Sequence, residues 1–403
     1  MINPPYCQKS FKKYDKSILK NIRHLECDHL VIYWLSIKMK TFLTALLILP
    51  TFLVGAQVQD SVKNAKRVRL TPLPVIYYSP ETRWGFGALV AANFETVKVP
   101  DTITKSSYAQ TYFLYTVNDQ YELGLSSRIY APKNKFIFHG KFNYTYFPEY
   151  YYGIETEDPE ASKDTIEYNR IAADLRFYWQ LKRNLFAGFA TRFSDIRNID
   201  GGPGGHFSED KPPGYQGYWL LGFAPALTLE TRDNFVYPRK GFYLEVLYCL
   251  YPSFDESSYG FRNFRLDARK YFPLKLTSDI DALAFQFIAN VNNGNVPFKD
   301  MADIGGSNTM RGYYTGFYRY NNLYALQVEL RTHIWWRLGV TAWLGAALTP
   351  EKWYTFFDHS LKPNAGLGLR IMMNRKDRLN VRVDQGFGKK GQSGFYLDIS
   401  EAF

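Results

Sequence analysis

The stretch DIGGSNTMRGYYTGFYRYNNL, residues 303–323, separates two strand-like segments and is the most distinctive part of this sequence. Gly305 and Gly306 allow a sharp turn because glycine readily takes positive φ. A single cation, Arg311, follows between Met310 and Gly312. Several aromatic side chains come directly after it: Tyr313, Tyr314, Phe317, Tyr318 and Tyr320. A long connection of this composition between strands is typical of a functional loop.

The composition favours a β-barrel in a membrane. The chain has 403 residues, of which 46% are apolar and 18% aromatic, yet its mean hydropathy is only −0.30. That combination argues against a bundle of membrane helices. It is typical of a transmembrane barrel, in which apolar and polar residues alternate and cancel in a window average. The alternative is a large soluble β-sandwich.

Strand-like segments run through most of the chain. We predict an all-β fold, an antiparallel transmembrane β-barrel of about 16 strands, with the long extracellular loop folded into its lumen. The predicted strands lie near 69–78, 82–95, 107–117, 120–131, 134–147, 166–181, 184–197, 215–231, 239–252, 259–272, 277–291, 323–336, 338–349, 363–373, 378–388 and 393–403.

Alternation with period two supports several of these strands. In residues 171–181, six apolar side chains face one way, while Asp174, Arg176 and Gln180 lie among the residues that face the other way. Residues 263–269 and 379–387 alternate similarly, whereas 277–291 alternates poorly. A polar face opposite an apolar face is what a barrel with lipid outside and water inside requires.

The lengths of the connections between the predicted strands give an independent indication of an outer-membrane barrel. If the first strand runs outward, the long connections fall outside the cell and the short ones fall in the periplasm, as is usual for outer-membrane barrels. The long connections are 148–165, 198–214, 292–322 and 350–362, the short ones are 132–133, 182–183 and 374–377, and 96–106 is an exception.

The sequence GGSNTMRGY, residues 305–313, resembles the (V/I/M)RG(F/Y) signature of the BamA/TamA-like outer-membrane protein superfamily, also called the bacterial surface antigen family. The resemblance extends over residues 69–403 and includes GLGLR at 366–370 and VRVDQG at 381–386. It implies that Arg311, Gly312 and Tyr313 form a motif in the sixth extracellular loop, which folds back into a 16-stranded barrel.

Two more segments carry the resemblance. TRDN at 231–234 and YPRKG at 237–241 are similar to a tight periplasmic turn of that family, with Arg232, Asp233, Asn234, Pro238 and Gly241 as its motif. Asp and Asn stabilise such turns by hydrogen bonds to the backbone. The end of the chain, FYLDISEAF, resembles the C-terminal signal read by the outer-membrane assembly machinery, which assigns that role to Phe395 and Phe403.

An arginine inside a lumen needs an anionic partner, because removing a cation from water is costly. Period two places Glu329 and Asp384 on inward faces. The family pairs this arginine with a strand Glu, which Glu329 matches, and with an Asp in the next strand. Residues 340–348 contain no carboxylate, so Asp384 is the candidate for the second partner. The alternative is that Arg311 lies in an exposed loop and pairs with nothing.

Pro72 and Pro74 fall in or just before the first strand. Proline removes a backbone donor and is confined to sheet edges. If both prolines lie within the strand, the seam between the first and last strands is the weakest part of the wall. If they precede it, they have no such effect.

The N-terminal region predicts export. Residues 1–38 are a basic, irregular extension that we interpret as spurious or disordered, with Met39 as the true start. Residues 39–56 have the charged start, apolar run and small residues (Val54, Ala56) of a signal peptide. Residues 57–68 form a short periplasmic segment before the barrel at 69–403. This leaves no room for the periplasmic POTRA domains that relatives usually carry. The alternative is a genuine cytoplasmic tail on an anchor helix.

No catalytic, metal-binding or cofactor-binding constellation stands out. The four histidines after residue 56 are scattered, and none has metal-ligand spacing. His139 lies on a polar face and is the one candidate for a lipolytic site, which would also need a nearby serine. The formal net charge of +11 falls to +6 without residues 1–56, which carry eight basic and three acidic residues. That excess is too diffuse to indicate nucleic-acid binding.

The resemblance implies an outer-membrane protein, not an enzyme, that inserts or translocates proteins, or lipids, at the outer membrane of a Gram-negative-type cell. The expected partners are outer-membrane lipid, the machinery that inserts the barrel, and a separate periplasmic protein that supplies the POTRA-like function. The alternatives are a passive pore or structural barrel and, with less support, a lipolytic enzyme.

Overall fold

The computed structural model describes residues 68–97, 104–202, 204–355, 360–375 and 378–403. The predicted extension at 1–38, the signal peptide at 39–56 and all but the last residue of the segment at 57–68 lie outside this part of the chain.

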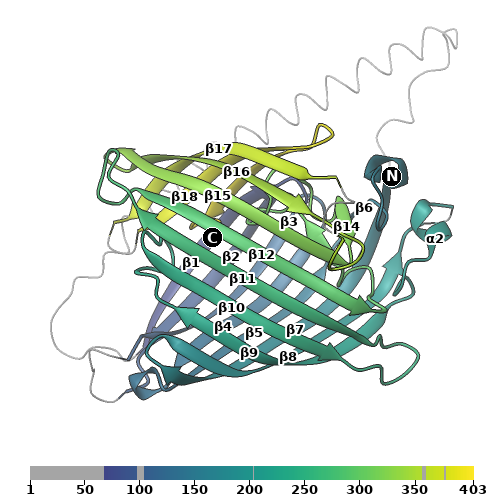
Figure 1. The fold of residues 1–403 in the computed structure, drawn as a ribbon, viewed down its shortest axis with the longest axis horizontal. Helices are drawn as coiled ribbons and strands as arrows, with labels where there is room; N and C mark the ends of the chain where they lie inside the picture. The colour runs from purple at the N-terminus through teal and green to yellow at the C-terminus, as the bar shows by residue number, and fades with distance from the viewer. Residues whose placement is uncertain (1–67, 98–103, 203, 356–359, 376–377) are drawn as a thin grey trace, which may run out of the picture. The chain divides into compact units, whose positions relative to one another are not determined.

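The described chain forms a closed antiparallel barrel of 16 strands (Figure 1). Each strand pairs with its neighbour along the chain, and the last strand pairs with the first. The prediction of an all-β barrel is therefore confirmed. The wall strands are β1 (Val68–Ser79), β2 (Arg83–Phe94), β3 (Ser107–Thr116), β4 (Tyr121–Tyr130), β5 (Phe136–Tyr146), β7 (Asp164–Lys182), β8 (Leu185–Asp200), β9 (Tyr218–Glu230), β10 (Gly241–Tyr251), β11 (Phe261–Pro273), β12 (Ala282–Gly294), β15 (Asn322–Trp335), β16 (Leu338–Leu348), β17 (Lys362–Asn374), β18 (Leu379–Gly388) and β19 (Ser393–Ile399).

Shorter elements lie in the connections. β6 (Glu149–Tyr151) pairs with the start of β7, and β13 (Ala302–Ile304) pairs with β14 (Tyr318–Tyr320). The helical segments are η1 (Pro132–Asn134), η2 (Pro159–Ser162) and α2 (His206–Asp210). Among the described residues, no helix is long and apolar enough to cross a membrane.

The predicted alternation is present in the wall. On β7, the outward side chains Phe177, Trp179 and Leu181 are 37%, 42% and 59% exposed. Earlier on the same strand, Asp174 and Arg176 point inward and form ion pairs in the lumen. Burying such an apolar outer face requires lipid, because a soluble protein rarely exposes so large an apolar surface.

Two predicted strand boundaries were wrong. The strand expected at 277–291 begins only at Ala282, because the Asp281 carboxylate accepts hydrogen bonds from the backbone amides of Leu276, Thr277 and Ser278 and holds those residues in a turn. The strand expected at 393–403 ends at Ile399. Ser400 has a φ of 72°, so the chain turns there and residues 401–403 are buried.

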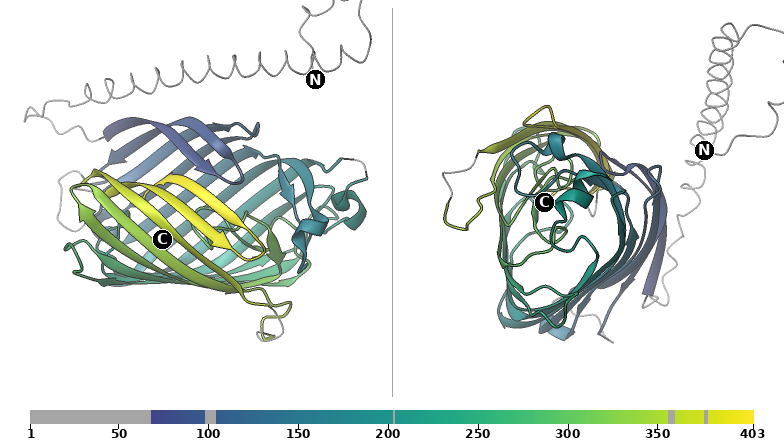
Figure 2. Two further views of the ribbon diagram at one scale, coloured as in Figure 1. Left: turned by 90° about the horizontal axis from the view of Figure 1, so that it is seen from above. Right: turned by 90° about the vertical axis from the view of Figure 1, so that its right-hand side faces the viewer.

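The connections segregate as expected from their lengths. Because successive wall strands are antiparallel, the long connections 147–163, 201–217, 295–321 and 349–361 share one end of the barrel, and the short turns 183–184 and 336–337 share the other. Figure 2 (right) looks onto the end with the long connections and shows chain segments inside the ring of strands.

Candidate functional site

The connection between β12 and β15, residues 295–321, enters the lumen and is called the lumen loop below. Its aromatic side chains are buried rather than exposed, and Tyr313 and Phe317 have no exposed surface. They pack with Tyr152 from the connection 147–163, whose ring lies 5.0 Å from that of Phe317. This aromatic cluster is buried inside the barrel and fixes the position of the loop tip.

Two glycines allow the loop tip to lie directly against the wall. Gly312 has a φ of 115°, and a Cβ atom there would lie 2.6 Å from the backbone nitrogen of Phe387. On the facing strand, a Cβ atom on Gly386 would lie 2.7 Å from the carbonyl of Arg311. Any side chain at either position would push the loop away from β18.

Arg311 is fully buried and touches three wall strands. Its guanidinium donates to Glu329 on β15 and, at 2.5 Å, to Asp384 on β18. It also stacks on the ring of Trp343 on β16, 3.7 Å from the ring centroid. A planar guanidinium can make all three contacts at once, which an ammonium group cannot.

The backbone around Arg311 is held as well. The amide of Gly312 donates to the Tyr396 hydroxyl at 3.0 Å, and Asn364 donates to the Arg311 carbonyl at 2.9 Å. The Tyr313 hydroxyl donates to the Pro363 carbonyl at 2.6 Å. The structure thus brings the motif Arg311, Gly312 and Tyr313 together with Glu329 and Asp384.

The two carboxylates belong to a larger buried network. Arg331 donates to Glu329 at 2.7 Å, and Arg370 donates to Asp384 at 2.5 Å and to Glu401 at 2.7 Å. Arg382 lies 3.3 Å from Asp384. Such a network is stable only while its members stay paired, because an uncompensated buried charge is costly.

Sequence reasoning did not identify several members of this network. Arg331 and Arg382 lie two residues from Glu329 and Asp384, respectively, and so share their inward faces, which means that alternation could have indicated them. Trp343 occupies the strand where the family's second carboxylate was expected, and nothing in its neighbourhood signalled that contact. Glu401 was not identified because the predicted last strand, 393–403, includes this residue, whereas β19 ends at Ile399.

The lumen loop also contacts the strands at the barrel seam. Glu81, in the turn between β1 and β2, accepts hydrogen bonds from the Thr315 amide at 2.8 Å and from its hydroxyl at 2.9 Å. Tyr396, which binds Gly312, is on β19. One loop therefore binds both sides of the junction where the barrel closes.

That junction is narrow. β1 pairs with β2 over its whole length, from Val68 to Ser79, but its pairing with β19 consists of the single residue pair Tyr78–Leu397 among the described residues. β1 and β19 are the purple and the last yellow strands of Figure 2 (left). Pro72 and Pro74 lie within β1, which settles the alternative left open by the sequence.

The predicted turn motif lies at the opposite end from the long loops. Asp233 accepts from the amides of Arg239 and Lys240, and Asn234 accepts from those of Val236 and Tyr237. The turn closes at Gly241, whose φ is 112° and which follows Pro238 by three residues. Arg232 pairs with Glu230 at 2.6 Å, and Arg378 reaches Asp233 at 2.9 Å.

Burial favours a higher pKa for the Asp233 carboxyl, but hydrogen bonds from the Arg239 and Lys240 amides and from Arg378 lower its pKa overall. This turn is thus held by a charged carboxylate.

The two residues assigned to the C-terminal signal lie on different faces. Phe395 points outward, with its ring 5.4 Å from that of Tyr78 on β1. Phe403 is buried in the lumen beside Tyr271 and Ala284, and its carbonyl accepts from Arg331 at 2.6 Å.

His139 does not form a catalytic pair with a serine in any contact of the described residues. Its ring packs edge-on against Tyr178, and its strand neighbours are Arg128 and Arg176. No group of three or more His, Cys, Asp or Glu side chains within the described chain is arranged to hold a metal ion.

A domain model of the Omp85 superfamily matches residues 87–375. Among solved structures, the chain is similar to BamA from Haemophilus ducreyi lacking POTRA domains 1–3, with 12% identity, a TM-score of 0.55, and coverage of 84% of this chain and 71% of that one. It is also similar to CdiB from Acinetobacter baumannii (11% identity, TM-score 0.50) and from Escherichia coli (10%, 0.52).

The match spans 83% and 84% of this chain but only 60% and 64% of those two CdiB chains. At these identities the likeness concerns the fold. A search of curated proteins found no match.

Proposed function

Because this chain belongs to the Omp85 superfamily, we propose that it inserts or translocates proteins, or lipids, at a bacterial outer membrane. The observation that carries the proposal is the seam: one residue pair joins β1 to β19, and one locked loop binds both sides. The barrel fold and the family point to an outer membrane as its location.

The seam supports a lateral opening because little free energy holds it shut. A net backbone hydrogen bond contributes about 0.5–1.5 kcal/mol, so a junction of one residue pair is far weaker than the neighbouring β1–β2 ladder. The rest of the β19 edge presents backbone groups that can pair with an incoming strand. In β1, Pro72 and Pro74 lack this donor, which makes β19 the better template.

The lumen loop links this seam to the interior. Opening the seam would strain the hydrogen bonds between Glu81 and Thr315 and between Tyr396 and Gly312, the residue after Arg311. We therefore propose that Arg311 holds the loop in the lumen, an interaction that we call the lock. The loop in turn connects the two strands on either side of the seam.

A disulfide across the seam tests the proposal. Tyr78→Cys with Leu397→Cys, in a Cys249→Ser background that removes the free buried cysteine, joins the one paired position. In cells depleted of the native protein and carrying only this variant, oxidation should abolish the insertion of outer-membrane proteins, and reduction should restore it. The matched control is Val90→Cys with Thr111→Cys, a pair within the continuous β2–β3 ladder, which should have no effect. Normal insertion with the oxidised seam would contradict lateral opening.

The second candidate is a passive pore, favoured by Lys141 and Arg265, which lie on inward faces and are exposed, so that water reaches part of the lumen. Conductance in planar bilayers distinguishes the two. A steady ohmic current through the native protein, together with normal insertion of outer-membrane proteins in cells depleted of it, would favour the pore. A lipolytic activity has no observation in its favour, because no serine among the described residues is hydrogen-bonded to His139.

The remaining parts of the proposal concern partners. Outer-membrane lipid covers the outer face, and the assembly machinery would read Phe395 and Phe403 before folding buries Phe403. A separate periplasmic protein would supply the POTRA-like function, and a pull-down from solubilised envelope tests for it.

A further inference from the structure

A group of cations lies at the end of the barrel that carries the short turns. Lys133 and Lys135 are in the connection between β4 and β5, and Lys182 and Arg183 are where β7 turns into β8. These four residues are called the turn cluster below. All four are exposed, and no carboxylate in the described ranges lies within ion-pair distance of any of them. Neighbouring cations without counter-charges favour a bound anion.

The carboxylates near these turns do not compensate the charge. Glu230 reaches the β7–β8 turn, where its backbone amide donates to the Asn184 carbonyl at 2.9 Å, but its side chain is paired with Arg232 at 2.6 Å. Glu95, directly after β2, is exposed and forms no ion pair with a described cation. Even with Glu95 counted, the turns keep a clear excess of positive charge.

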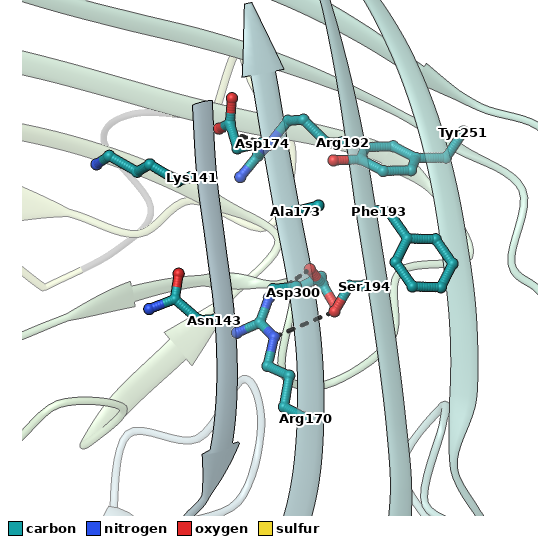
Figure 3. Close-up of a pocket in the computed structure, with 11 residues that line it drawn as sticks. Lys141, Asn143, Arg170, Ala173, Asp174, Arg192, Phe193, Ser194, Tyr251 and Asp300 are labelled. Atoms are coloured by element: carbon teal, nitrogen blue, oxygen red, sulfur yellow. Dashed lines mark hydrogen bonds and ion pairs between the residues drawn. The ribbon is translucent and has the colours of Figure 1, made fainter. Parts of the chain in front are cut away.

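The arginines inside the lumen are arranged differently. Beside the cavity shown in Figure 3, Arg170 lies 3.7 Å from Asp300 and donates to Ser194 at 3.1 Å. Arg192 lies 3.5 Å from Asp174. These arginines are paired by carboxylates of the chain itself, whereas the turn cluster depends on an anion from outside the chain.

The two turns of the cluster are neighbours in space. β5 pairs with β7 in the wall (Figure 1), and the Gln180 amide donates to the Lys135 carbonyl at 2.9 Å. Lys182 and Arg183 follow Gln180 by two and three residues in the sequence, which is about 7–10 Å along a strand. Long lysine and arginine side chains can therefore converge on one anionic group from both turns.

An aromatic surface lies next to the turn cluster, on the outer face of the same strands. Phe136 on β5 and Trp179 on β7 are opposite each other and are 51% and 42% exposed. The ring of Phe189 on β8 lies 5.6 Å from that of Trp179 and 5.0 Å from that of Phe177. Aromatic side chains gather where the apolar band of a membrane barrel meets the headgroups. The turn cluster is therefore at the depth of lipid headgroups.

An apolar groove crosses this outer face. It has a volume of about 200 Å³ and is lined mainly by apolar side chains of β4, β5 and β7, among them Ile129 and Trp179. Two hydroxyls of its lining are bonded elsewhere: Tyr178 donates to Glu245 at 3.1 Å, and Thr96 donates to a backbone carbonyl at 2.5 Å. The groove thus offers a hydrocarbon surface, and in a membrane the matching occupant is an acyl chain.

We infer that the turn cluster and this groove together bind an anionic phospholipid of the leaflet at the short-turn end. Lys135, Lys182 and Arg183 hold its phosphate, and an acyl chain lies in the groove. Basic side chains at this depth bind headgroup phosphate through charge-assisted hydrogen bonds. A soluble anion would leave the groove empty, and a folded protein cannot enter a face that lipid covers. The site is separate from the Arg311 lock and does not depend on the proposed function.

Mass spectrometry of the intact, folded protein in a non-ionic detergent tests the site. It counts bound lipid at rising concentrations of phosphatidylglycerol or, separately, of phosphatidylethanolamine, which has no net charge. We expect one tightly bound phosphatidylglycerol and at least tenfold weaker binding of phosphatidylethanolamine. Each cation near a headgroup contributes about fivefold in affinity, so Lys135→Gln/Lys182→Gln should weaken the binding of phosphatidylglycerol at least tenfold.

Two further variants serve as controls. Lys135→Arg/Lys182→Arg keeps both charges and should retain the binding of the native protein. Lys240→Gln/Lys275→Gln removes two exposed cations from the β9–β10 and β11–β12 turns at the same end of the barrel and should leave the affinity unchanged. An equal loss in this second control would indicate diffuse attraction to a positively charged end and would overturn the site.

Competition distinguishes the lipid from other anions. The soluble headgroup glycerophosphoglycerol should displace bound phosphatidylglycerol at least tenfold less well than the lipid itself. Equal displacement would mean that the groove takes no part and would overturn the assignment to a lipid. Equal binding of phosphatidylglycerol and phosphatidylethanolamine would overturn the role of the cations. Efficient displacement by a polyglutamate peptide would assign the turn cluster to an acidic protein instead.

Discussion

At the scale of single residues, Arg311 is where loss of one side chain should matter most. Arg311→Ala would strand Glu329 and Asp384 in a buried site. Breaking a buried pair in this way costs about 3–5 kcal/mol, less where lumen water reaches it. We expect the barrel to fold but to show faster proteolysis within residues 305–322 and a larger or noisier conductance.

Matched variants make this prediction specific. Arg311→Lys should rescue poorly, since an ammonium group cannot span both carboxylates and Trp343. Arg197→Ala, at a side chain that is 74% exposed, should change neither readout. Exchanging charges as Arg311→Glu with Glu329→Arg should restore little, because the new glutamate would face Asp384. Unchanged loop protection in Arg311→Ala would remove the lock from the proposed function.

Asp233 gives a pH prediction at the same scale. Its lowered pKa means that the folded state binds this proton less tightly than the unfolded state, so its contribution to stability is present above the unfolded value of about 3.9 and is lost as pH falls through the folded pKa. The free energy of unfolding in lipid vesicles should therefore differ between native protein and Asp233→Asn above about pH 5, and the two should converge in acid. A constant difference down to the lowest pH would contradict this.

At the scale of elements, the wall strands should tolerate a charge on one face only. Leu175→Lys places a cation on the outer face of β7 and should cost about 2–4 kcal/mol if the position is near the bilayer midplane. Gln180→Lys, on the inner face of the same strand, should be mild. Folding yield into lipid vesicles against urea concentration measures both. Equal sensitivity would argue against lipid at the outer face.

At the scale of the whole molecule, the N-terminal sequence predicts where the mature protein begins after export. If residues 39–56 are a signal peptide, as the sequence predicts, cleavage after Ala56 gives a protein that begins at Gln57. Intact-mass measurement of the protein from the outer membrane checks this, with the mass of the uncleaved chain from Met39 as the comparison. Any peptide from residues 1–38 in that fraction would contradict the predicted start.

The sequence by itself predicted the barrel and its strand number and placed Glu329 and Asp384 on inward faces as candidate partners, because period two fixes which face each side chain takes. Only the tertiary structure decided which faces meet. The contact of Trp343 with Arg311, the place of Glu401 in the buried network and the single-pair seam between β1 and β19 all join residues from strands that are distant in sequence. Their contacts depend on the curvature and closure of the wall and on where the loop lies in the lumen, and no local pattern encodes these.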